Sequence, residues 1–169
     1  IKNKYINLQE IEYLKKEYYQ TYQNNKNNKQ FKKDYKNIND FIENHNEEYI
    51  TNKRKQTAIL ENINGYPLDE YQSRVVLSNC KASLVIAGAG SGKSLTIIGK
   101  IIYLTKECNI KPSDILCISF TNDATNNLKN NLKKQHNLDI DVYTFHKLSL
   151  KILKDNNITY DIAPEDLLD

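Results

Sequence analysis

Three glycines, a lysine and a serine in residues 83–94 (SLVIAGAGSGKS) are the residues of this chain best suited to chemistry. Glycines at 88, 90 and 92 permit a positive φ and let successive backbone N–H groups approach a polyphosphate. A helix is predicted to begin at Lys93, and its N-terminal N–H groups favour an anion. Lys93 can then reach the β- and γ-phosphates, and the Ser94 hydroxyl can ligate Mg²⁺. The segment therefore predicts a phosphate-binding loop for a magnesium nucleoside triphosphate.

The loop departs from G-x-x-x-x-G-K-[ST] at its first position, where Ala87 stands in place of glycine. Ala87 needs a negative φ, which fits a residue that still belongs to the buried strand predicted over 83–87. The alternative is a glycine-serine hairpin between two strands. Apolar residues at helical spacing follow the loop and favour the phosphate loop instead. They are Leu95, Ile98, Ile101, Ile102 and Leu104.

Length and composition allow one domain, or a small domain with an appendage, because the chain has 169 residues, 39% hydrophobic and 27% charged. No apolar run approaches the roughly 20 residues of a membrane span, and no signal peptide is recognisable, so we expect a cytoplasmic protein without a membrane partner. The first residue is Ile1, which predicts a fragment or a processed product. The three cysteines are widely spaced and are expected to be reduced packing residues, neither disulfide-bonded nor zinc-bound.

The net charge of +3 lies in the first part of the chain. Residues 1–63 contain 12 Lys and Arg against 9 Asp and Glu, whereas residues 64–169 contain 12 of each. The part that carries the glycine loop is therefore neutral overall. Any binding of nucleic acid must be argued from particular residues.

Residues 1–63 contain neither proline nor glycine and predict two helices joined by a loop over 23–29. We expect them to fold as a separate domain, a helical hairpin or coiled coil. His45 is interpreted as a packing residue and not as a ligand. The tyrosines could stack on nucleic-acid bases, but their heptad spacing favours core residues. The apolar seam of the first helix contains Leu8, Ile11, Tyr18 and Tyr22, and that of the second contains Phe31, Tyr35, Ile38, Ile42, His45, Tyr49, Ile59 and Ile63.

The residues 64–67 (NGYP) mark a boundary, and residues 64–169 alternate between strand and helix patterns. The predicted fold class is α/β, a P-loop parallel sheet with helices on both faces. The loops 88–94, 119–123 and 144–147 should then line one edge of the sheet. Beyond the strand over 83–87, strands are predicted over 115–120, buried on both faces, and 140–144, and helices over 68–77, 93–108, 122–135 and 145–154.

Four segments in this order resemble the motifs of UvrD/Rep-type superfamily 1 DNA helicases. Residues 68–72 (LDEYQ) are similar to the Q motif, 87–94 to motif I with its initial alanine, 115–128 (ILCISFTNDATNNL) to motif Ia, and 142–146 (VYTFH) to motif Ib. The N-terminal extension before them resembles the helicase IV and HelD branch. The resemblance implies that residues 64–169 are the N-terminal portion of a RecA-like domain.

The resemblance also implies an ATP-driven motor that binds ATP, Mg²⁺ and single-stranded DNA. Lys93 and Ser94 would be catalytic, Ser94 would hold the metal, and the amide of Gln72 can meet the N6–H and N7 edge of adenine. The other nucleotide-binding positions are Ala87, Gly88, Ala89, Gly90, Ser91, Gly92 and Leu95. The DNA-binding positions are Phe120, Thr121, Asn122, Thr144, Phe145 and His146. The alternative is that both phenylalanines are core residues and that His146 braces a loop.

Two positions depart from the family pattern, because Leu95 stands where relatives have an arginine and Asp123 where a lysine is common. No Asp-Glu pair on a later strand and no arginine of a second RecA-like domain follow, and phosphoryl transfer needs both. We therefore expect a fragment that binds nucleotide without turning it over. The competing interpretations are an interaction protein that docks on RNA polymerase through residues 1–63, and a different P-loop enzyme such as a small-molecule kinase.

Overall fold

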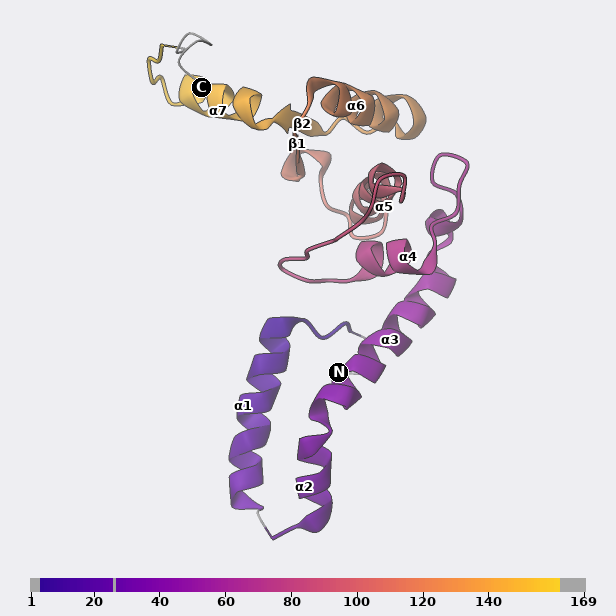
Figure 1. Cartoon of the computed structure of the whole chain (residues 1–169), viewed down its shortest axis with the longest axis vertical. Helices are drawn as coiled ribbons and strands as arrows, with labels where there is room; N and C mark the ends of the chain where they lie inside the picture. The colour runs from indigo at the N-terminus through magenta and orange to yellow at the C-terminus, as the bar shows by residue number, and fades with distance from the viewer. Residues whose placement is uncertain (1–3, 26, 162–169) are drawn as a thin grey trace. The chain divides into compact units, whose positions relative to one another are not determined.

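The computed structural model describes residues 4–25 and 27–161 and divides into two compact units, Ile1–Tyr103 and Leu104–Asp169 (Figure 1). Within the described residues, no helix is both long and apolar enough to cross a membrane. The first unit contains α1 (Leu8–Asn24), α2 (Lys29–Lys36), α3 (Ile38–Gln56), the 3₁₀-helix η1 (Ala58–Glu61), α4 (Glu70–Leu77) and most of α5 (Lys93–Lys106). The second contains η2 (Pro112–Asp114), β1 (Leu116–Ser119), α6 (Asn122–His136), β2 (Asp141–Thr144) and α7 (Phe145–Asp155).

The helices α1 and α2 contact each other and run in opposite directions (Figure 1). A capping box starts α1, in which the Asn7 side chain accepts from the Glu10 N–H at 3.1 Å and the Glu10 carboxylate accepts from the Asn7 N–H at 3.1 Å. The second predicted helix is interrupted at Asn37, between α2 and α3, and α3 ends at Gln56. The side chains of Phe31 and Tyr35 lie outside the described residues. The coiled coil and the domain division after residue 63 stay predictions.

The inner face of α3 contacts the extended segment that precedes α1. The Asn46 amide bonds both backbone groups of Ile6, accepting from its N–H at 2.8 Å and donating to its carbonyl at 2.9 Å. The ring of Tyr5 lies edge-on to that of Tyr49, with centroids 6.1 Å apart. His45 Nε2 lies 2.8 Å from the carbonyl of residue 4, so His45 braces backbone. Three residues of α3 thus contact the segment that precedes α1.

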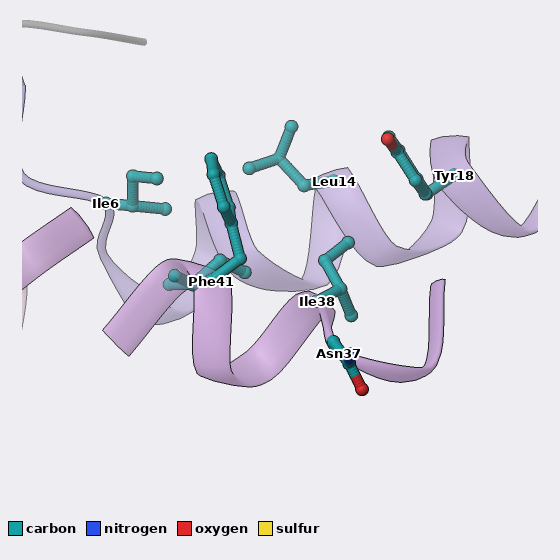
Figure 2. A pocket seen from close by; sticks show the side chains of 7 residues that line it. Ile6, Leu14, Tyr18, Asn37, Ile38 and Phe41 are labelled. Atoms are coloured by element: carbon teal, nitrogen blue, oxygen red, sulfur yellow. The ribbon is translucent and has the colours of Figure 1, made fainter. Parts of the chain in front are cut away.

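An apolar cavity of about 380 Å³ lies between α1 and α3 (Figure 2). It is lined by Ile6, Leu14, Tyr18, Asn37, Ile38, Phe41 and Ile42. Among these side chains Ile42 is 4% exposed whereas Phe41 is 62% exposed. The cavity is therefore lined by both a buried and a largely exposed side chain of α3.

The core of the first unit forms where η1, the turn after it, α4 and α5 meet. A two-residue turn at Asn64 and Gly65, both with positive φ, lets Ile63 and Tyr66 exchange backbone hydrogen bonds of 2.8 and 3.1 Å. The turn folds the chain back, so that the Leu68 N–H donates to the carbonyl of residue 60 at 2.8 Å. The buried side chains of this core are Leu60, Ile63, Leu68, Val76, Leu77, Ile98 and Ile102.

In the second unit, β1 and β2 pair in parallel, with a register that runs from Leu116 opposite Asp141 to Ser119 opposite Thr144. The helix α6 connects the two strands and α7 follows β2 directly, so the unit contains one βαβ crossover. Asn137 ends α6 in the left-handed conformation, with φ 52°. The chain is thus mixed α/β with a parallel pair of strands.

Two predictions about strands are wrong. Residues 83–87 form no strand, and Leu84 and Ile86 are 88% and 91% exposed. The strand β1 is not buried on both faces, since Leu116 is 50% and Ile118 42% exposed. A buried parallel strand needs paired strands at both edges and helices on both faces, and within the described residues only β1 and β2 pair as strands. The complete P-loop sheet with helices on both faces stays a prediction.

Candidate nucleotide site and nucleic-acid edge

The first turn of α4 fixes the side chain of Gln72. Asp69 caps the helix, and its carboxylate accepts from the Gln72 N–H at 2.8 Å. In return the Gln72 side-chain oxygen accepts from the Asp69 N–H at 3.0 Å. This reciprocal capping box fixes the orientation of the Gln72 amide.

The Gln72 amide lies directly against the glycine loop, in the same unit of the structure. Its Nε2 donates to the Ser91 carbonyl at 3.2 Å. A Cβ added at Gly92 would lie only 2.4 Å from this Nε2, so a side chain at 92 would displace Gln72. The structure thus brings together two sites that are twenty residues apart in the sequence.

The loop turns through two of its three glycines. Gly90 and Gly92 have φ of 74° and 77°, a region that other residues rarely adopt. Gly88 does not have a positive φ, so the prediction for this position is wrong. The chain leaves the extended segment only after Gly88, whose carbonyl accepts from the Ser91 hydroxyl at 2.8 Å. Ala87 likewise avoids positive φ, as its side chain requires.

Lys93 begins α5 and folds over the loop. Its ammonium donates to the carbonyl of Ala87 at 3.3 Å and also to that of Gly88. Lys93 and Ser94 are both exposed at the N-terminus of this 14-residue helix. A cation and a hydroxyl beside unpaired N–H groups suit a polyphosphate and its metal ion, so the donor set fits Mg²⁺ with a nucleotide. Leu95 follows and is half-buried.

In the second unit the parallel register places two predicted loops at one edge. Ser119 lies opposite Thr144, so the residues after them emerge at the same end of the sheet. Phe120 is 90% and Phe145 64% exposed, so neither is a core residue of this unit. Asn122 and His146 are exposed in the first turns of α6 and α7.

The two threonines of this edge already serve as helix caps. The Thr121 hydroxyl accepts from the Ala124 N–H at 3.2 Å, and that of Thr144 accepts from the Lys147 N–H at 3.3 Å. Thr144 is also buried, at 6% exposure. Both hydroxyls are therefore engaged in capping the helices α6 and α7 that begin at this edge. The hydrogen bond from the neighbouring Tyr143 hydroxyl to the Asp141 carboxylate, 3.1 Å long, raises the pKa of the Tyr143 phenol.

Sequence reasoning missed two features of the nucleotide site. The capping role of Gln72 was readable, because Asp69 and Gln72 have the D-x-x-Q spacing of a capping box. The other missed feature is Lys100, whose ammonium contacts the end of α4. Nothing in the local sequence marks a lysine that reaches a different helix.

The loop, the capped glutamine and the βαβ unit define a class that comparison with known proteins identifies. Residues 68–167 match the family described as the UvrD/REP helicase N-terminal domain. This match spans more than half of the chain, which therefore belongs to that family.

Individual relatives carry helicase names. Over 75 residues the chain is 47% identical to the ATP-dependent DNA helicase Rep of Buchnera aphidicola subsp. Schizaphis graminum, a match that covers 42% of this chain and 11% of the relative. It is 39% identical over 90 residues to a probable DNA helicase II homolog of Mycoplasma capricolum, covering 52% and 12%. It is 30% identical over 112 residues to DNA helicase IV of Escherichia coli, covering 65% and 16%. The matches thus span a small part of each relative.

Proposed function

We propose that the whole protein is an ATP-dependent DNA helicase, in which this chain supplies the nucleotide loop and part of the path of single-stranded DNA. The observation that carries the proposal is the contact of the Gln72 amide with the loop, through the Ser91 carbonyl and Gly92. A glycine loop alone fits many nucleotide-binding proteins. A capped glutamine seated on it adds a group that can read the base, as an adenine nucleotide requires.

Phosphate binding is assigned to the loop and to Lys93. The ammonium exchanges its two loop carbonyls for the β- and γ-phosphate oxygens, where a charge-assisted bond is stronger. Backbone N–H groups at the start of α5 bind the remaining oxygens. Mg²⁺, when bound, neutralises phosphate charge, and Ser94 is the residue that would hold it.

Adenine recognition is assigned to Gln72. Its capping and loop bonds use one lone pair of the oxygen and one N–H of the amide. One acceptor and one donor therefore remain, which match the N6–H and N7 of adenine. Guanine presents an acceptor at the position of N6, so the same amide orientation discriminates against it.

Binding of single-stranded DNA is assigned to the edge after β1 and β2. The exposed rings of Phe120 and Phe145 offer faces on which bases stack, at about 1–3 kcal/mol per base. Asn122 and His146 offer polar groups for phosphate and sugar. Since Thr121 and Thr144 cap helices, we assign them to shaping the edge.

The test is ATP hydrolysis by the full-length protein with and without nucleic acid. Single-stranded DNA should stimulate hydrolysis. Phe120→Ala should raise the DNA concentration needed for half-maximal stimulation by roughly tenfold, because a stacking surface is lost. Phe41→Ala is the matched control, because Phe41 is also exposed but lies on α3. Stimulation by RNA polymerase alone would favour the interaction protein, and transfer to a small phosphoacceptor would favour the kinase. Either result would contradict the proposal.

A further inference from the structure

The helices α4 and α5 lie with their N-termini at the same end. At the start of both helices, Gln72 contacts Ser91 and Gly92. Two turns further along α5, a Cβ added at Gly99 would lie 3.5 Å from Val76 of α4. The nearest atom to that Cβ belongs to Leu68, at 2.9 Å, and Val76 comes next. Since α4 meets α5 at both Gln72 and Val76, a shift of α4 along α5 would carry Gln72 away from the loop.

Lys100 of α5 holds the other end of α4. Its ammonium donates to the carbonyls of Val76 at 2.7 Å and Ser78 at 2.9 Å, and lies 3.5 Å from that of Val75. These carbonyls lie in and just after the last turn of α4, where a helix lacks its own N–H partners. A cation there also interacts favourably with the helix dipole. The half-buried lysine thus acts as a C-cap supplied by another helix.

This clamp matters because α4 has only eight residues. So short a helix is not stable by itself and depends on its two ends and its packing. The capping box with Asp69 secures the first end, and Lys100 secures the second. Lys93 and Lys100 stand seven residues apart on α5, two turns along one face. One helix therefore carries both the phosphate-binding cation and the cation that positions α4.

We propose that Lys100 is a positioning residue that keeps Gln72 against the phosphate loop and so contributes to the selection of adenine over guanine. The proposal rests on the nucleotide site of the proposed function. Lys100 acts through α4 and does not touch the nucleotide. An arginine can replace it in part, because its guanidinium also donates several hydrogen bonds.

The test measures binding of ATP, GTP and inorganic tripolyphosphate to the full-length protein and to its Lys100→Met variant by calorimetry. Lys100→Met should lower the ratio of ATP to GTP affinity by about threefold to tenfold, and change tripolyphosphate affinity less than about twofold. Lys100→Arg should restore part of the ratio of ATP to GTP affinity. Lys106→Met, at the exposed end of the same helix, is the matched control for lost charge and should leave the ratio unchanged.

An unchanged ratio in a folded Lys100→Met protein would overturn the proposal. An equal loss of affinity for all three ligands would also overturn it, because that pattern marks general damage to the loop. Should Lys100→Met not fold, the neutral Lys100→Gln replaces it, with the same expectations. A parent protein that binds tripolyphosphate but does not prefer ATP would overturn the adenine assignment along with this proposal. A parent that binds none of the ligands would overturn the proposed function itself.

Discussion

At Gly92 the conformation of the loop depends on the same residue that leaves room for Gln72, the residue to which we assign adenine recognition. Its φ of 77° excludes most side chains, and its missing Cβ leaves room for Gln72. Gly90 has a similar φ of 74° but open space around it. A side chain at Gly90 would therefore add backbone strain alone, whereas a side chain at Gly92 would add the same strain and also collide with Gln72.

We expect Gly92→Ala to weaken ATP binding more than Gly90→Ala, because both add strain of about 1–3 kcal/mol but only the first displaces Gln72. Calorimetry of both variants with ATP and tripolyphosphate measures the difference. The extra loss at residue 92 should be larger for ATP than for tripolyphosphate. Equal losses at the two positions would mean that Gln72 is not seated on the loop.

Ser73, beside Gln72 on α4, is fully buried, and its hydroxyl has no hydrogen-bond partner among the described residues. An unpaired buried hydroxyl costs about 1–3 kcal/mol, so Ser73→Ala should raise the free energy of unfolding by about 1 kcal/mol. Urea unfolding measures this change. Ser78→Ala is the control, since its hydroxyl donates to the Val75 carbonyl at 3.2 Å, and it should not stabilise. A loss of stability in Ser73→Ala would show that the hydroxyl is bonded.

The sequence predicted a helix that begins at Lys93 directly after a glycine turn, and the structure has both, because glycine spacing and the apolar pattern of the following helix are local signals. It did not predict that Gly88 keeps an ordinary φ, since that depends on where the chain leaves its extended path. The role of Gln72 toward adenine stays a prediction. The residue's contact with the loop comes from packing between α4 and α5, which no single segment encodes.

Among the elements, α3 shows how tertiary contacts select one face of a helix. The heptad spacing predicted a seam through Ile42, His45 and Tyr49, whereas the buried residues of α3 are Ile42 and Ile50. Asn46, midway between them, bonds the backbone of Ile6. The buried residues of α3 therefore lie on the face that contacts the segment before α1. The spacing of apolar residues within α3 could not predict this contact, because the segment is about forty residues away in the sequence.

The substitution Ile42→Asp tests this face of α3. Ile42 is 4% exposed, so a buried unpaired carboxylate should lower the free energy of unfolding by more than about 3 kcal/mol. Phe41→Asp, at a neighbouring position that is 62% exposed, should cost less than about 1 kcal/mol. Thermal unfolding followed by circular dichroism compares them. Similar costs at both positions would mean that α3 buries a different face.

The strand predicted over 83–87 is absent, because an apolar run alone does not make a strand. Its apolar run is a local signal, yet Leu84 and Ile86 are largely exposed because no described strand pairs with the segment. Strand structure depends on partners, whereas α5 forms from its own sequence and its packing on Val76. The bounds of α6 and α7 were predicted to within two residues, because a helix is marked by the residues of its own segment.

For the whole molecule, the sequence predicted the family through the order of four motifs, and the family match over residues 68–167 confirms it. The glycine loop belongs to one unit of the structure, and the exposed Phe120 and Phe145 belong to the other. The charge of residues 64–169 is balanced, so the proposed binding of DNA is assigned to these particular side chains and not to net charge. Coupling between nucleotide and DNA is therefore a property to test in the full-length protein.

Calorimetric titration of this 169-residue chain with ATP and GTP in the presence of Mg²⁺ tests whether residues 69–94 form an adenine nucleotide site. We expect ATP to bind more tightly than GTP. Lys93→Ala should weaken both by about 2 kcal/mol, because it removes a charge-assisted contact to phosphate. Gln72→Ala should reduce the difference between the affinities for ATP and GTP. Equal affinity of the parent chain and of Lys93→Ala for ATP would show that Lys93 does not bind the phosphates and that residues 69–94 are not the nucleotide site.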